Sequence, residues 1–168
     1  DFLLRWIQDI RSNRNTMASV QMGLESNPND VALLLRQARN YLDADELEES
    51  TKFSAKAAEL DPDNINLRIL QGLHHLRLGK LEEAAAAAEA ACSADETNEE
   101  ARRLAVMIRL KQAEGLLKEK NYAGAIQEYT AALELDPENF SGHMGLGQAH
   151  NGDGALKEAF EEFQKAQT

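Results

Sequence analysis

The sequence of 168 residues is poor in cysteine, in basic residues and in long apolar runs. Cys92 is the only cysteine, so no internal disulfide can form and nothing indicates an oxidising compartment; we therefore expect a cytoplasmic protein. The 29 acidic residues outnumber the 18 basic ones and give a net charge of −11, which argues against nucleic acid and membrane-surface partners. Because no apolar run approaches the roughly 18 residues of a membrane span, we expect no membrane insertion.

Aromatic residues are also scarce. They make up 5% of the chain, although 43% of its residues are hydrophobic. Ala, Leu, Glu and Lys dominate, and this mixture favours helix nearly everywhere. The composition therefore predicts a helical protein with a thin core that is distributed along the chain.

Proline occurs only three times, and its positions mark a repeat. Each proline is the second residue of a four-residue segment, here called the mark, and a fourth mark has Glu in that place. The marks begin at residues 27, 61, 95 and 136, so the intervals are 34, 34 and 41 residues. A period of this size is typical of stacked-repeat proteins. The marks are Asn27-Pro28-Asn29-Asp30, Asp61-Pro62-Asp63-Asn64, Asp95-Glu96-Thr97-Asn98 and Asp136-Pro137-Glu138-Asn139.

The marks divide the chain into repeats of two helices. In the longest interval the seven extra residues, 99–105, are predicted to extend the first helix by nearly two turns without rotating its apolar face by more than about 20°. We expect the chain to be a piece of a longer protein. The predicted boundaries, within a single solenoid, are 1–30 for a divergent or partial repeat, 31–64, 65–98, 99–139 with the extended first helix, and 140–168 for an incomplete repeat.

Amphipathic spacing and capping residues predict the individual helices. Before the first mark, one helical face carries Phe2, Leu3, Trp6, Ile7 and Ile10, and a second carries Met17, Val20 and Leu24. Asp45 is predicted to cap the second helix of its repeat, with Glu48 completing a capping box. Gly79 and Gly154 are predicted at the turns within their repeats, where a left-handed residue ends a helix. The other predicted helices run from Leu33 to Leu42, from Leu47 to Leu60, over 65–78 and over 80–94.

The last two repeats carry a recognisable pattern. Residues 140–168 read His143-x2-Leu146-Gly147-x2-His150 and then Ala159-x3-Phe163, and residues 99–139 supply Ala125-x3-Tyr129, Ala132 and Pro137. This pattern resembles the tetratricopeptide repeat, and four units in register cover residues 31–168. The resemblance implies an all-α fold, a right-handed α-α superhelical solenoid. Places are counted from residues 31, 65, 106 and 140, which leaves the seven extra residues 99–105 out of the count. Small residues at places 8, 20 and 27 of each unit are expected to let paired helices approach closely.

No group of residues in the sequence indicates catalysis or a cofactor. His143 and His150 share a helix face, but both occupy packing places of the repeat and no ligand set at zinc spacing completes them. The glycine-rich stretch 145–154 lacks the Lys-Ser/Thr of a phosphate loop. Gly142, Gly145 and Gly152 are not explained by the repeat and predict a helix that frays easily. We predict a chain that is not an enzyme and binds no metal.

Charge is distributed unevenly over the predicted helices. The first helices of the four units carry net charges of 0 to +2, whereas the second helices carry −2 or −3. The resemblance implies that first helices line a concave groove, which would then be mildly basic and apolar. We expect the partner to be a protein or peptide with acidic and apolar side chains. Alternatively, these charges form a solvated face, or other parts of a parent protein fill the groove. The groove residues implied by the resemblance are Leu35, Arg36, Arg39, Ile69, Leu70, Leu73, Arg77, Leu110, Lys111, Glu114, Lys118, Met144 and Gln148.

Three functions fit these expectations. The first is a non-catalytic scaffold that binds a partner segment within a larger assembly. The second is a co-chaperone module, prompted by a weaker resemblance of residues 116–139 to repeat co-chaperones of the J-domain type; its carboxylate clamp is not matched, because the three clamp places hold Leu110, Glu114 and Gly145. The third is the substrate-selecting arm of a larger enzyme.

Overall fold

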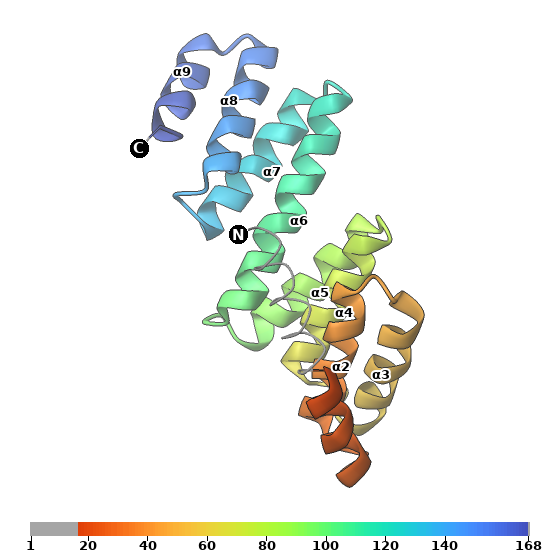
Figure 1. The fold of residues 1–168 in the computed structure, drawn as a ribbon. Coiled ribbons are helices and arrows are strands. Elements are labelled where there is room, and N and C mark those ends of the chain that lie inside the picture. Colours follow the sequence, from red (N-terminus) through yellow and green to blue (C-terminus); the bar gives the residue numbers. More distant parts are fainter. Residues whose placement is uncertain (1–16, 168) are drawn as a thin grey trace, which may run out of the picture. The chain divides into compact units, whose positions relative to one another are not determined.

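A computed structural model describes residues 17–167, and every regular element in that range is an α-helix (Figure 1). The all-α prediction is confirmed. The predicted helical face around Trp6 lies outside the described residues, whereas residues 17–26 are helical and bury Val20. The further helices are α2 (Val31–Asp43), α3 (Leu47–Leu60), α4 (Ile65–Arg77), α5 (Leu81–Ala94), α6 (Glu99–Lys118), α7 (Tyr122–Leu135), α8 (Phe140–Asp153) and α9 (Leu156–Lys165).

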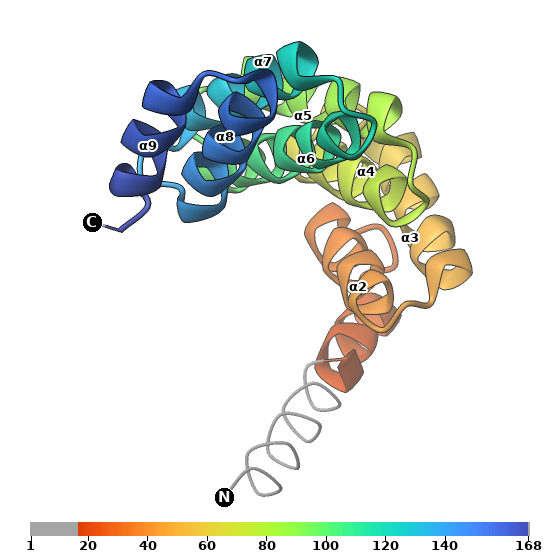
Figure 2. The same ribbon diagram turned by 90° about the horizontal axis from the view of Figure 1, so that it is seen from above.

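The chain forms two compact units, divided between Leu70 and Gln71 within α4. In the first unit α2 packs against α3. In the second, α6 packs against α5 and α7, and α8 lies between α7 and α9 (Figure 2). The single solenoid over residues 1–168 stays a prediction.

All four marks make the same turn. The backbone N–H of the last residue of the mark donates to the carbonyl of the first, with N···O distances of 3.1 to 3.4 Å. The side chain of that last residue then accepts a hydrogen bond from the first turn of the next helix; Asn98, for example, accepts from the N–H of Ala101 at 2.9 Å and caps α6. The mark at Asp95 has no proline and makes the same turn as the others. The capping residue at the fourth place of the mark, more than the proline at the second place, therefore starts each repeat.

The turn within each helix pair also recurs. Gly79 and Gly154 have φ values of 71° and 88°, so their predicted left-handed conformation is confirmed. Asp45 and Lys120 occupy the equivalent place with φ values of 62° and 61°, although neither is glycine. The predicted N-cap role of Asp45 is wrong, because α3 begins after Glu46 and has no side-chain cap. Since Asp45 is the left-handed residue that ends α2, it cannot take the extended conformation of an N-cap.

Small residues lie where the helices approach one another. In the first unit Ala38, Ser50 and Ala57 are fully buried, and the Ser50 hydroxyl donates to the carbonyl of Ala38 at 2.6 Å. The same places are buried in the second unit, except that Ala166 at the last of them is only partly buried, so the predicted packing role of places 8, 20 and 27 is confirmed for the buried residues. They are Gly72, Ala84, Ala91, Ala113, Ala125, Ala132, Gly147 and Ala159.

Helix α6 has 20 residues, seven more than α2 or α4, which confirms the predicted extension. Helix α8 is continuous in spite of its glycines. Each of three glycines makes room for a large side chain of α7: Gly142 faces Leu133, Gly145 faces Tyr129 and Gly152 faces Tyr122. These glycines are therefore explained by packing between repeats.

Candidate functional site: a pocket along helix α6

The second unit contains a pocket of about 860 Å³ beside the N-terminal part of α6. One wall is the face of α6 from Glu99 to Glu114, and the other is the corner between α7 and α8, from Leu135 to Ser141. The pocket follows from helix length, because α7 and α8 have 14 residues each and α6 has 20. The predicted extension of α6 thus contributes directly to a surface that is open to other molecules.

Apolar side chains form the middle of this pocket. Val106 is buried, Leu110 and Leu135 are partly buried, and Met107 is 44% exposed. An exposed methionine beside other apolar side chains is an adaptable contact for an apolar ligand group. The pocket therefore offers an apolar floor that water covers when no ligand is bound.

Charged side chains border this floor. The Arg103 guanidinium pairs with the Glu99 carboxylate at 3.1 Å, in contact with solvent. Arg102 and Lys111 also line the pocket, and within residues 17–167 neither forms an ion pair. Asp136 is already engaged, since it accepts a hydrogen bond from the Asn139 side chain at 2.9 Å. Two cations are therefore available to a ligand at this pocket.

The structure brings only some of the predicted groove residues together. Leu110, Lys111 and Glu114 line the same pocket. The other polar groove residues are exposed or form an ion pair. Arg39 is the one in an ion pair that the structure gives in detail: its guanidinium contacts the Asp43 carboxylate at 3.5 Å. Leu35, Ile69 and Leu70 are 7%, 1% and 2% exposed, so they belong to the core of the first unit and offer no surface. The others are Arg36, Arg77, Lys118 and Gln148, which are exposed, and Leu73 and Met144, which are partly buried.

Several pocket residues were not among those predicted from sequence. Val106 and Met107 follow the helical spacing of α6 and could have been found from it. Leu135, Asn139 and Ser141 could not, because they reach the pocket only through the packing of the α7–α8 corner against α6.

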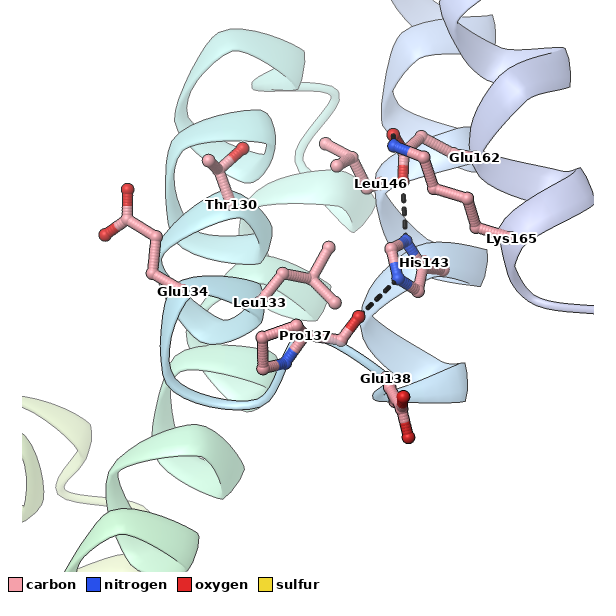
Figure 3. A pocket seen from close by; sticks show the side chains of 9 residues that line it. All are labelled: Thr130, Leu133, Glu134, Pro137, Glu138, His143, Leu146, Glu162 and Lys165. Atoms are coloured by element: carbon pink, nitrogen blue, oxygen red, sulfur yellow. Dashed lines mark hydrogen bonds and ion pairs between the residues drawn. The ribbon is translucent and has the colours of Figure 1, made fainter. Parts of the chain in front are cut away.

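A second polar cluster lies between α7, α8 and α9 (Figure 3). Nε2 of His143 lies 2.9 Å from the carbonyl oxygen of Pro137 and donates to it, because a carbonyl can only accept. Nδ1 of His143 lies 2.6 Å from the Glu162 carboxylate, which also accepts from Lys165 at 2.7 Å. The preceding repeat has an equivalent pair, Arg109 with Glu128 at 3.0 Å, and both pairs join residues 19 apart in sequence. His143 is therefore a packing residue that ties two helices of its repeat together, as predicted.

The pKa of Glu162 reflects this cluster. Burial raises the pKa of its carboxyl, but the hydrogen bonds from Lys165 and His143 outweigh burial, so the pKa lies below its ordinary value. The carboxylate is 12% exposed and is ionised at neutral pH. The contact between the Glu162 carboxylate and His143 Nδ1 joins α9 to α8.

The other titratable candidates are not arranged for chemistry. Burial, and to a lesser extent the negative charge of Glu89, raises the pKa of the Cys92 thiol. A raised pKa disfavours the reactive thiolate. Burial and then the neighbouring His75 lower the pKa of His74. Among residues 17–167, no set of three His, Cys, Asp or Glu side chains is placed to hold a metal ion. No helix in that range is long and apolar enough to span a membrane.

The sequence of the C-terminal part matches a known family. The family described as Tetratricopeptide repeat matches residues 110–168, which run from the second half of α6 to α9. This part of the chain, residues 110–168, therefore matches the tetratricopeptide repeat. A search of curated protein sequences finds no significant match.

Several solved structures share the fold over nearly the whole chain. A crystal structure of MamA has a TM-score of 0.67 at 18% identity, covering 95% of this chain and 89% of that one. YrrB, described as a tetratricopeptide repeat protein with an unusual peptide-binding site, has a TM-score of 0.61 at 20% identity, with 96% and 80% covered. PilW, described as a type IV pilus biogenesis factor, has a TM-score of 0.68 at 20% identity, with 98% and 73% covered. The expected helical-solenoid fold class is thereby confirmed.

Proposed function

We propose that this chain is a non-catalytic scaffold that binds a segment of a partner protein in the α6 pocket. The observation that carries the proposal is the open apolar floor around Met107 and Leu110, bordered by Arg102 and Lys111, which form no ion pair with any residue from 17 to 167. A peptide-binding site in YrrB, which has the same fold, adds support. The chain would act in the cytoplasm as part of a larger assembly.

The chemistry of the pocket favours a partner with apolar and acidic side chains. Apolar groups would displace water from Met107 and Leu110, and the free energy gained scales with the apolar area that both sides bury. Carboxylates would pair with Arg102 and Lys111, which orients the segment more than it strengthens binding. The partly buried groove residues Leu73 and Met144 remain proposed contacts, together with the exposed Arg36, Arg77, Lys118 and Gln148 and the ion-paired Arg39.

The co-chaperone function is less well supported. A carboxylate clamp needs donors, but the pocket presents Leu110 and the Glu114 carboxylate at two of the three clamp places. Without donors at these places, no clamp can hold the terminal carboxylate of a partner. We therefore favour the scaffold.

The test compares two substitutions of the same kind. Met107→Glu places a charge on the pocket floor, whereas Met22→Glu changes a methionine that is 67% exposed in the first unit. Partners captured from a lysate by affinity pull-down are quantified for wild type and both variants, after circular dichroism shows equal helix content. Met107→Glu is expected to reduce capture of the main partner at least tenfold, because a buried unpaired charge is costly, and Met22→Glu is expected to leave it unchanged. Equal capture by all three proteins would place the binding surface elsewhere.

A further inference from the structure

The first unit contains a smaller pocket, here called the α2 pocket, between the helix of residues 17–26, α2 and α3. Its volume of about 220 Å³ is below the roughly 300 Å³ at which pockets for drug-sized ligands begin, so it suits a single side chain. Residues three or four apart in sequence share one face of a helix, and this spacing gives each helix wall. The lining residues are Gln21, Leu24, Glu25, Gln37, Tyr41 and Phe53.

Gln37 brings a buried acceptor to the α2 pocket. The residue is 2% exposed, and its side-chain oxygen Oε1 has no hydrogen-bond partner within residues 17–167. A buried acceptor without a donor destabilises a protein, so a ligand donor that reaches Oε1 supplies a bond that these residues do not make. The last torsion of a glutamine side chain is broad, so the amide can turn its oxygen toward the pocket. The α2 pocket is therefore suited to a ligand with a hydrogen-bond donor.

The charge at the α2 pocket has one sign. Among residues 17–167, Glu25 is the one charged residue that lines the pocket, and its exposed side chain forms no ion pair there. Lys52 of α3 is engaged outside the pocket, where it contacts the Glu49 carboxylate at 2.6 Å. Lys56 of α3 donates to a backbone carbonyl, also at 2.6 Å. The lining thus holds one carboxylate and no cation, and this imbalance favours a cationic ligand.

An aromatic pair favours a guanidinium as that cation. The rings of Tyr41 and Phe53 stack with their centroids 5.5 Å apart and their planes at 21°. Arginine is the cation found most often over the face of an aromatic ring. Its planar group carries five N–H donors, so it can stack on a ring while its edge donates to Gln37 and Glu25. The ammonium of lysine has no plane that could stack in this way.

We propose that the α2 pocket binds an arginine side chain of a partner protein. The guanidinium stacks on the aromatic pair, donates to Oε1 of Gln37 and pairs with the Glu25 carboxylate. The methylene groups of the arginine pack on Leu24, as the stems of long cationic side chains do on apolar surfaces. The α2 pocket and the α6 pocket lie in different compact units, and the proposal does not depend on the function of the α6 pocket.

The test titrates the full chain with three blocked amino acids. The ligands are the Nα-acetyl N-methylamides of arginine, of lysine, and of citrulline, which is the uncharged isostere of arginine. The side-chain amide of Gln37 and the backbone amides of Tyr41 and Phe53 are followed by nitrogen–proton NMR. Their shifts give dissociation constants at about 150 mM salt, where charges far from the pocket are screened.

Arginine is expected to bind at least about fivefold more tightly than citrulline, because only arginine forms charged hydrogen bonds with the Glu25 carboxylate. It is expected to bind at least about fivefold more tightly than lysine, because only a guanidinium stacks on a ring and donates to two acceptors at once. The shifts are expected at all three observed residues.

Two substitutions each remove one acceptor. Glu25→Gln and Gln37→Met are each expected to weaken arginine binding at least about threefold, and Glu25→Gln is expected to abolish the preference for arginine over citrulline. Because Glu25 is exposed, its substitution leaves the core intact and keeps the test valid if Gln37→Met unfolds the protein. Glu59→Gln is the matched control: it removes the same charge from an exposed residue of α3 outside the pocket, and is expected to keep the wild-type dissociation constants. Circular dichroism first establishes equal helix content.

Four results would overturn the proposal. These are no shift at any observed residue, equal binding of arginine and citrulline, lysine binding as tight as that of arginine, and equal loss of binding in Glu25→Gln and Glu59→Gln. Arginine binding that becomes tighter when Arg5, Arg11 and Arg14 are replaced by Gln would also overturn it, because an arginine of the chain itself would then compete for the pocket. None of these results changes the outcome of the Met107→Glu pull-down, so the scaffold function is tested separately.

Discussion

Gly145 allows a direct test of the packing between α7 and α8. It lies in the middle of α8 and faces the ring of Tyr129 on α7. A Cβ atom at this position would overlap Cε1 and Cζ of that ring and lie 2.7 Å from its hydroxyl oxygen. Tyr129 is 3% exposed and packs with Ala113, Ala125 and Leu146, so the ring cannot swing aside.

Two opposing effects decide the stability of Gly145→Ala. Alanine favours the helix over glycine by about 1 kcal/mol. Overpacking a buried contact costs about 1–3 kcal/mol. Because the overlap is with two atoms of a confined ring, we take the upper part of that range and expect a net destabilisation of about 1–2 kcal/mol.

Gly115→Ala is the matched control. Gly115 lies within α6, and a Cβ atom there would have no neighbour within 4 Å. The same substitution should therefore stabilise the protein by up to about 1 kcal/mol. The two variants are predicted to change the free energy of unfolding in opposite directions.

The assay is urea unfolding followed by circular dichroism at a helical wavelength, with the midpoint as readout. A double-mutant cycle with Tyr129→Leu should give a coupling free energy with Gly145→Ala, since the smaller side chain leaves room for the methyl group. If Gly145→Ala raises the midpoint as Gly115→Ala does, α8 does not need glycine for its close approach to α7.

Two further predictions concern a turn and an ion pair. Lys120→Gly should stabilise the protein by about 1 kcal/mol in urea unfolding, because Lys120 has a φ of 61° and only glycine adopts this conformation without strain; unchanged or lower stability would contradict this. Glu162→Gln should cost about 1.5 kcal/mol at pH 7 through the loss of charged hydrogen bonds. Since the folded state lowers the pKa of Glu162, the stabilisation by this carboxylate is complete above the unfolded pKa of about 4.3 and disappears as the pH falls through the folded pKa. The free energies of unfolding of wild type and variant should therefore become equal in acid. A difference that stays constant with pH would refute the role of ionisation.

The turns were predictable because their signals are local. A cap such as Asn98 and a left-handed residue such as Gly79 act on groups within a few residues in sequence. The ends of α3 at Leu47 and Leu60 were predicted correctly for this reason. Asp45 was assigned the wrong role because aspartate suits both an N-cap and a left-handed turn, and only the observed end of α2 distinguishes them.

Four features can be read from the sequence: the period, the helix pairs, the small residues between helices and the extra length of α6. Period and capping are properties of neighbouring residues, so they can be read without knowing what packs against what. The packed structure was needed to show which of the predicted groove residues are exposed, since Leu35, Ile69 and Leu70 are core residues. It also explains why α8 carries glycines, and it shows that the extension of α6 meets the α7–α8 corner in a pocket. These features depend on contacts between helices, and no spacing along one helix contains that information.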